Sequence, residues 1–261
     1  MTSAILSFTL ILLCNLSDQP DLRYWEGYLI NGQRILTGPL RWRQADWFRA
    51  LALTTATVGL YNYDQGIDRY IQDHRTNTTD RIADWVRPFG DPLYVMPPVG
   101  GWLLFGYLFN NKKARTTALS ALESFILTSA ITYTIKHATH RHRPNSNDSY
   151  DVWDGPGFES EHLSFPSGHA STSFAIMTVI ASQYDEHIIV PTLCYSIATL
   201  TTLSRINDQA HWASDVFIGS LVGFITARTI LNHDQEEKEK RLDLIPKLEN
   251  NRLSLGLIYK I

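Results

Sequence analysis

The stretch KHATHRHRP, residues 136–144, contains the densest group of basic and titratable side chains in the sequence. It directly follows the apolar stretch SFILTSAITYTI, residues 124–135. Pro144 cannot continue a helix and disfavours helical geometry in the residue before it. An apolar helix is therefore expected to end here, with its basic residues at the edge of the apolar layer. Taken alone, this pattern also suits long basic side chains that reach towards water or lipid headgroups.

The composition of the 261-residue chain limits the classes of protein to consider. Hydrophobic residues make up 44% and charged residues 19%, which fits one large or two small folded domains. The net charge of -3 excludes a polycation that coats nucleic acid, so no nucleic-acid partner is expected and any anion site must come from local clustering. Cys14 and Cys194 lie in apolar segments and are expected to be packing residues.

Six apolar helices are predicted, at about residues 45–63, 92–110, 117–135, 169–184, 188–204 and 212–230. A more polar helix is predicted at about 67–87, with Thr79 or Asp80 as its starting cap. A membrane span needs about 20 mostly apolar residues. Several runs here are shorter, and the mean hydropathy is -0.14. The pattern favours an integral membrane protein, and an exported water-soluble helical bundle is the alternative.

The two ends of the chain are expected to lie outside the helical domain. Residues 1–17 form a candidate signal peptide or anchor, although no Lys or Arg precedes the apolar run. Residues 18–44 are predicted to be a non-helical extension, because Asn31-Gly32 between apolar stretches is typical of a hairpin. Residues 231–261 begin as a charged tail.

The chain then closes on RLSLGLIYKI, where apolar residues occupy alternate positions, as in a strand. These residues are Leu253, Leu255, Leu257, Tyr259 and Ile261. The pattern is compatible with an edge strand or with an outer-membrane-type terminal strand.

A second motif, PSGH at residues 166–169, precedes the helical run ASTSFAIMTVIAS. Ser167 is a good helix cap, and Gly168 allows close approach of a ligand to the backbone. The first free N–H groups of the helix would point at an anion, with His169 in the first turn beside it. Taken alone, PSGH is also an ordinary helix cap.

A third motif, SRINDQAHWASD at residues 204–215, places His211 and Asp215 four residues apart. On a helix they share a face, so the carboxylate can fix the imidazole tautomer and leave the other ring nitrogen free to attack. His169 could then protonate the leaving oxygen. Taken alone, the pair would be an ordinary surface contact. The three motifs together predict phosphoryl transfer through a phosphohistidine.

Three cations complete this predicted site, because Lys136, Arg143 and Arg205 can pair with phosphate oxygens. His137, His140 and His142 could mimic a metal cluster, but no pair of them lies four residues apart. No metal site and no cofactor are therefore expected, and vanadate is expected to inhibit as a phosphate mimic.

The combination K-x6-RP, PSGH and SR-x5-H-x3-D resembles the signature of the type 2 phosphatidic acid phosphatase (PAP2) superfamily. This superfamily includes lipid phosphate phosphatases, bacterial acid phosphatases and vanadium-dependent haloperoxidases. The resemblance covers roughly residues 45–230 and implies an all-α bundle of about six core helices, with the site at one end. It implies His211 as nucleophile, Asp215 as its partner and His169 as general acid. The phosphate ligands that it implies are Lys136, Arg143, Ser167, Gly168 and Arg205.

Residues 137 and 140–142 are spacers in this interpretation. The segment 145–162 is expected to cover the site, and its carboxylates would disfavour highly anionic substrates unless they pair with the arginines. Among them are Asp148 and Asp154.

The leading hypothesis is a metal-independent phosphatase that acts on a phosphomonoester or pyrophosphate of a lipid. The candidate lipids are phosphatidic acid, phosphatidylglycerol phosphate, isoprenyl pyrophosphates and lipid A phosphates. The site is expected on the extracytoplasmic face of a membrane. The alternatives are an exported soluble acid phosphatase, a vanadium haloperoxidase, a PAP2-like transferase and a catalytically dead lipid-binding protein.

Overall fold

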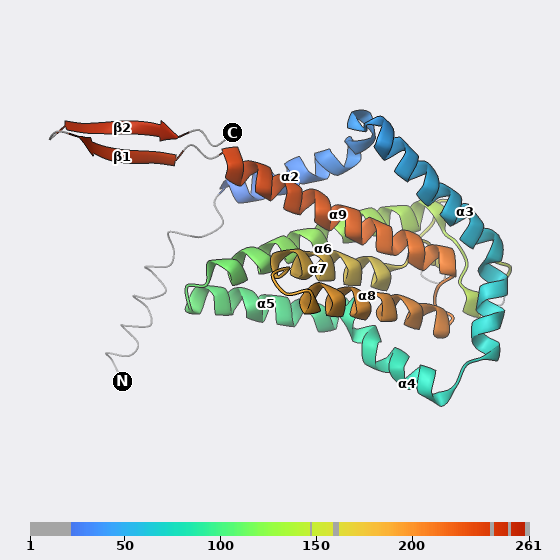
Figure 1. Ribbon diagram of the computed structural model, residues 1–261. Helices are drawn as coiled ribbons and strands as arrows, with labels where there is room; N and C mark the ends of the chain where they lie inside the picture. The colour runs from blue at the N-terminus through green and yellow to red at the C-terminus, as the bar shows by residue number, and fades with distance from the viewer. Residues whose placement is uncertain (1–21, 147, 159–161, 241–242, 250–251, 259–261) are drawn as a thin grey trace, which may run out of the picture.

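The computed structural model describes residues 22–146, 148–158, 162–240, 243–249 and 252–258. Its helices form a bundle (Figure 1). They are α2 (Leu22–Leu36), α3 (Gln44–Asp73), α4 (Asn77–Val86), α5 (Pro92–Leu108), α6 (Lys112–Thr139), α7 (Gly168–Gln183), α8 (Ile189–Asn207) and α9 (Ala213–Lys240). Short 3-10 helices occur at η2 (Gly38–Arg41), η3 (Arg87–Gly90) and η4 (Pro144–Ser146). The predicted all-α fold is confirmed, with the antiparallel strands β1 (Asp243–Glu249) and β2 (Arg252–Ile258) after it.

The centre of the bundle is α7, which contacts α6, α8 and α9 (Figure 1). Apolar side chains from α5, α6, α7 and α9 form one buried cluster, which includes Val99, Ala121, Ile176 and Leu231. A second cluster joins Ala170 at the start of α7 to the C-terminal end of α8, the N-terminal end of α9 and one face of α3. Burial of these apolar surfaces fixes the N-terminal end of α7 against the α8–α9 connection.

Two glycines on α9 allow it to approach α7 closely. A Cβ atom at Gly219 would lie 2.5 Å from the Ser167 carbonyl oxygen, and one at Gly223 would lie 2.2 Å from that of Ser171. Both distances are far below van der Waals contact with backbone atoms. The beginning of α7, which carries the PSGH motif, therefore lies directly against the first turns of α9.

The variant Gly223→Ala is expected to destabilise the protein by about 1–3 kcal/mol, because the new methyl group would force α7 and α9 apart. Thermal and denaturant unfolding of the detergent-solubilised protein would measure the loss. Gly59→Ala on α3 is the matched control, since no atom lies within 4 Å of its added Cβ atom. Equal unfolding midpoints for Gly223→Ala and Gly59→Ala would contradict the close-packing argument.

The surface of the bundle is rich in apolar side chains. Three helical segments are long and apolar enough to cross a membrane, namely Lys112–Thr139, Ile189–Asn207 and Ala213–Glu236. Large apolar side chains are exposed on them and on α3, among them Ile126, Tyr133, Leu193, Leu203, Ile225, Trp47, Phe48 and Leu51. Exposed apolar surface of this extent is typical of contact with lipid. The chain is therefore a membrane protein, as the apolar helix pattern favoured.

The prediction of a non-helical extension at residues 18–44 is wrong, because α2 and η2 occupy most of it. Asn31 lies within α2, where its side chain is buried and its Nδ2 donates a hydrogen bond to Glu123 Oε1 at 2.8 Å. This contact with α6 outweighs the turn preference of Asn-Gly. Residues 1–17, the candidate signal peptide or anchor, lie outside the described residues.

The more polar helix predicted at 67–87 is divided between α3 and α4. Thr76 is the cap of α4, and its side chain accepts a hydrogen bond from the Thr79 backbone N–H. The cap of α4 therefore lies three residues before Thr79, the first of the two predicted caps. The strand prediction is confirmed for Leu253, Leu255 and Leu257, which lie in β2 and pair with β1. Tyr259 and Ile261 lie outside the described residues.

Candidate active site

The three sequence motifs meet at the end of the bundle where α6 stops and α7 and α9 start. Lys136 lies in the last turn of α6, Ser167 caps α7, and His211 lies between α8 and α9. The positive charges of Lys136, Arg143 and Arg205 all act on the His211 ring. The structure thus brings together side chains that are up to 75 residues apart in sequence (136 to 211).

His211 is almost completely buried, with only 4% of its surface exposed. Its Nδ1 lies 3.9 Å from Asp215 Oδ2, and it has no hydrogen-bond partner among the described residues. The imidazole therefore faces the carboxylate as expected, but the distance between Nδ1 and Oδ2 is too long for a hydrogen bond. Because Nδ1 faces the carboxylate, Nε2 is the ring nitrogen left for attack on a substrate.

Burial holds the pKa of His211 well below its usual range, and the charges of Lys136, Arg143 and Arg205 lower it further. A buried imidazole favours its neutral form, and nearby cations add to this preference. His211 is therefore neutral, with a free electron pair, at pH values near neutrality. This is the protonation state that a nucleophile requires.

Asp215 is held rigidly by donors on several sides. Its side-chain oxygens accept hydrogen bonds from Ser164 Oγ at 2.5 Å and from the Trp212 backbone N–H at 3.0 Å. Its backbone carbonyl accepts a hydrogen bond from the Ser167 N–H at 3.0 Å. Asp215 and the cap of α7 are therefore connected directly. Ser164 has no place in the three motifs, and sequence reasoning missed it.

Arg141 is the main residue that sequence reasoning misjudged, since it was interpreted as a spacer. Its guanidinium is completely buried and bridges Asp215 Oδ1 at 2.5 Å and Asp64 Oδ2 at 2.8 Å. It also donates to the Tyr150 carbonyl oxygen through Nε and Nη2. The aromatic rings of Tyr61, Trp153 and Trp212 surround it, at 4.9, 4.9 and 5.6 Å from their centroids. Arg141 therefore holds the side chains of Asp64 and Asp215 in place by buried ion pairs.

A sequence signal for this network does exist on α3. Asp64 lies in the same helical stripe as Leu60, Ile67 and Ile71, which pack against the second buried cluster. A carboxylate in such a stripe must be buried, and a buried carboxylate needs a partner. Asp64 also accepts a hydrogen bond from the Ser214 backbone N–H at 2.8 Å, which ties α3 to the start of α9.

The N-terminus of α7 has the predicted form. Ser167 Oγ accepts a hydrogen bond from the Ala170 N–H at 3.4 Å. A Cβ atom at Gly168 would lie 3.9 Å from Lys136 Cε, so Lys136 passes close to this helix end. His169 packs tightly against Gly90, where an added Cβ atom would lie 2.6 Å from the His169 carbonyl oxygen. Burial lowers the pKa of His169 to about 4, and the charge of Arg205 contributes to the shift.

Arg143 and Arg205 line a cavity of about 510 Å³ at the surface of this site. The Nε of each is buried and has no hydrogen-bond partner among the described residues. Such unpaired donors are costly unless an anion satisfies them. The other residues that line the cavity are Arg75, Asp80, Asp84, Arg87, Asn145, Asp208 and Ala210. Four arginines and three aspartates thus line the cavity, and Lys136, His169 and His211 are not among its lining residues.

The segment that was expected to cover the site packs on the end of α6. The Gly157 N–H donates to the His137 carbonyl oxygen at 3.0 Å, and the Asp154 N–H donates to that of His140 at 3.2 Å. Just after this segment, Lys136 Nζ donates to the carbonyl oxygens of Leu163 and Ser164. Asp148 and Asp154 contact the two ring nitrogens of His142, each at 2.7 Å, and not the arginines of the cavity. Both carboxylates are thus paired with His142, whereas Arg205 pairs with Asp208 at 2.8 Å.

The family model of the PAP2 superfamily matches residues 117–238, the segment that contains all three motifs. The chain is 30% identical to Lipid phosphate phosphatase 1 of Arabidopsis thaliana over 220 aligned residues. The alignment covers 70% of this chain and 65% of that protein. Lipid phosphate phosphatase 2 of the same plant is 27% identical over 230 residues, or 72% and 75% of the two chains. The segment that contains the three motifs is therefore similar to the PAP2 superfamily domain.

The fold is also that of a solved structure, described as the first transmembrane PAP2 type phosphatidylglycerolphosphate phosphatase from Bacillus subtilis. The TM-score is 0.58 at 18% sequence identity, and the match covers 73% of this chain and 98% of the other. At this identity the likeness shows a shared helical fold.

Proposed function

We propose that this protein is a membrane phosphatase that hydrolyses a phosphomonoester or pyrophosphate of a lipid through a phosphohistidine on His211. The observation that carries the proposal is a neutral, buried imidazole that faces a fixed carboxylate and lies among three cations at a helix N-terminus. This arrangement supplies a nucleophile and positive charge for the phosphate oxygens. The curated relatives that are named as lipid phosphate phosphatases support the same reaction class.

The geometry supports a two-step reaction. Lys136, Arg143, Arg205 and the N–H groups that follow Ser167 bind the phosphate oxygens. Nε2 of His211 attacks phosphorus, a P–N bond forms, and the P–O bond to the leaving group breaks. His169 gives its proton to the departing oxygen. Water then attacks phosphorus, His169 takes a proton from it, and the P–N bond breaks to release phosphate and neutral His211.

His169 must be protonated when the substrate is bound, although its pKa is low in the empty site. Its low pKa comes from burial and from the charge of neighbouring cations, with Arg205 the largest. A bound phosphate dianion offsets these cations and favours the charged imidazolium. Substrate binding therefore prepares the general acid.

We infer that the substrate is a lipid because the site lies at the end of helices whose outer faces are apolar. A lipid phosphate held in the headgroup region would meet the 510 Å³ cavity while its acyl chains stay in the bilayer. Phosphatidic acid, phosphatidylglycerol phosphate, isoprenyl pyrophosphates and lipid A phosphates all satisfy this geometry. We place the site on the extracytoplasmic face of the membrane.

The proposed transfer step draws its positive charge from side chains and needs no metal ion. Lys136, Arg143 and Arg205 together match the charge of a phosphoryl group in transfer. Vanadate, which resembles the transferring phosphoryl group, should compete with substrate at the same ligands. A chelator should leave the turnover of each folded molecule unchanged.

Phosphate release by detergent-purified protein is the direct test of this function. The substrates are phosphatidic acid, phosphatidylglycerol phosphate, undecaprenyl pyrophosphate and p-nitrophenyl phosphate, with His211→Ala as the blank. We expect kcat/KM to be highest for one of the lipids. A preference for p-nitrophenyl phosphate, in protein that stays monodisperse without detergent, would instead establish an exported acid phosphatase.

The variant His169→Gln is expected to lower kcat by about 10²–10⁴-fold for a lipid phosphate, whose alkoxide needs a proton to leave. It should lower kcat far less for p-nitrophenyl phosphate, because p-nitrophenolate leaves readily without a proton. Burst kinetics with both substrates would separate the first step from hydrolysis of the intermediate. An equal loss of the first step on both substrates would contradict the role of general acid.

A further inference from the structure

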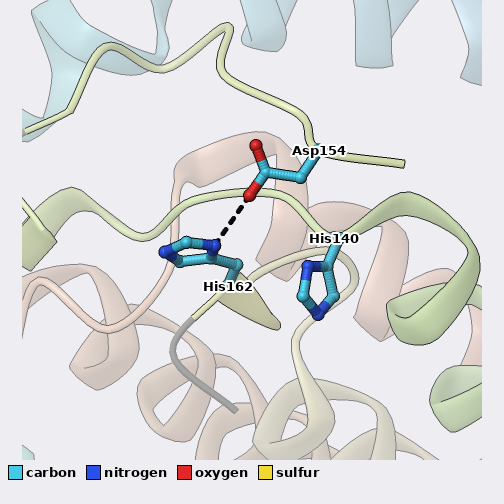
Figure 2. Close-up of side chains that lie close together, drawn as sticks. All are labelled: His140, Asp154 and His162. Carbon is cyan, nitrogen blue, oxygen red and sulfur yellow. Dashed lines mark hydrogen bonds and ion pairs between the residues drawn. The ribbon is translucent and has the colours of Figure 1, made fainter. Parts of the chain in front are cut away.

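A group of imidazole and carboxylate side chains lies beside the active site and takes no part in the proposed reaction. It consists of His140, Asp154 and His162, which converge from the end of α6 and from the α6–α7 segment (Figure 2). We propose that these three residues bind one divalent transition-metal ion, with Zn²⁺ as the best fit. Two imidazoles and one carboxylate, with a fourth position open to water, form a ligand set that suits this ion.

The geometry is close to that of a metal site. Each of the three residues offers one ligand atom, and all three atoms lie within 4.8 Å of one another. Ligand atoms bonded to Zn²⁺ at about 2.0–2.2 Å lie about 3.3 Å apart in a tetrahedral arrangement. The partly exposed side chains of Asp154 and His162 therefore need to move by about an ångström or somewhat more, which rotation about their χ angles can supply.

His140 is the most deeply buried of the three proposed ligands. The residue is only 3% exposed, and its Nε2 is buried without a hydrogen-bond partner among the described residues. The other ring nitrogen of His140 faces Asp154 and His162, and it is the one in position to bind the ion (Figure 2). The His140 backbone is left-handed, with a φ of 50°, and this turn directs the ring away from the axis of α6.

The backbone around His140 holds the three residues together. The Asp154 N–H donates to the His140 carbonyl oxygen at 3.2 Å. The His140 ring is covered by Gly157, where an added Cβ atom would lie 2.7 Å from Cε1. His162 Nδ1 lies 2.7 Å from Asp154 Oδ2 (Figure 2). The segment thus packs on the ring of one ligand and carries the other two.

His142 supports this site from the side. Its ring stacks on the His162 ring with centroids 3.6 Å apart, and its Nε2 lies 2.7 Å from Asp154 Oδ2. Residues that hydrogen-bond to metal ligands orient them and strengthen binding. A zinc ion here would fasten residues 154 and 162 to the end of α6, next to Arg141. Its role is therefore structural, and the inference does not depend on the identity of the substrate.

The spacing of His137, His140 and His142 in the sequence does not favour a metal site, because no two of them lie four residues apart. The ligands that the structure brings together come instead from a helix cap and from a loop, for which the i, i+4 rule has no meaning. Only His140 is shared between the two sets.

The test is zinc stoichiometry of tag-free protein, stripped with a chelator, dialysed against buffered Zn²⁺ and analysed by elemental mass spectrometry. We expect one zinc ion per chain in the wild type and in His211→Ala. Zinc should be lost in His162→Ala and in Asp154→Asn, whereas His142→Ala should bind it about 10–100-fold more weakly. Asp151→Asn on the same segment and His187→Ala at the α7–α8 connection are the matched exposed controls.

The outcomes are distinct from those of the phosphatase assay. No zinc in the wild type, or zinc retained by both His162→Ala and Asp154→Asn, would overturn the metal site. Loss of zinc in His211→Ala would place the ion at the phosphate site and overturn it as well. A wild type that binds one zinc ion but releases no phosphate would leave the metal site standing and refute the proposed function.

Discussion

Substitution of His211 by alanine is expected to lower kcat by about 10⁴-fold or more on every substrate that the protein hydrolyses. The reason is that the imidazole is the only proposed nucleophile that attacks phosphorus, and burial and three cations favour its neutral form. Initial rates of phosphate release would measure the loss. Trapping of labelled enzyme after acid-free denaturation should show a phosphorylated protein in the wild type alone.

The variant Asp215→Asn is expected to lose less activity than His211→Ala, because Asp215 orients the imidazole and does not react. It should also lower the unfolding midpoint, since Arg141 would face a neutral amide. His211→Gln, which keeps more of the buried volume, serves as a second variant if His211→Ala fails to fold. Turnover by a folded His211 variant above one hundredth of the wild-type rate would contradict the phosphohistidine mechanism.

Substitution of Arg141 by methionine is expected to destabilise the protein by about 3–5 kcal/mol. The change removes the cation that two completely buried carboxylates share, and those of Asp64 and Asp215 would remain with no positive partner. It also removes the donors to the Tyr150 carbonyl oxygen. Denaturant unfolding followed by tryptophan fluorescence would report the loss, because Trp153 and Trp212 lie beside the guanidinium.

Arg81→Met, at an exposed position of α4, is the control for Arg141→Met and should change stability by less than about 0.5 kcal/mol. The double variant Asp64→Asn/Arg141→Met should recover part of the loss, since one of the two uncompensated charges is removed. Equal stability of Arg141→Met and Arg81→Met would mean that the buried network contributes nothing. The pairing of Arg141 with both carboxylates would then be wrong.

The parts of the site that the sequence revealed are those held by local geometry. Ser167-Gly168 before an apolar run specifies a helix cap, and a basic run before Pro144 specifies a helix end. These rules depend only on neighbouring residues, so motif and structure agree. The apolar helices α5 to α9 occur in the predicted order, although α6 begins five residues before its predicted start and α9 ends ten residues after its predicted end.

The parts that the sequence did not reveal depend on contacts between distant segments. Asn31 reads as a turn until Glu123, which lies on another helix, accepts its hydrogen bond. Arg141 reads as a spacer until α3 supplies Asp64 from 77 residues away. The proposed ligands His140 and His162 likewise come from separate places. No periodicity in a single segment encodes such pairs, because each residue is locally unexceptional.

The contact of Gly219 with the Ser167 carbonyl oxygen has an effect on how substitutions in this chain should be understood. Gly219 lies one helical turn beyond Asp215 on α9. Any side chain there would displace Ser167, the residue that caps α7. Position 219 is therefore a packing position whose substitution would also move the proposed phosphate ligand Ser167. A survey of natural variants that scores packing and catalysis separately would place it in the wrong category.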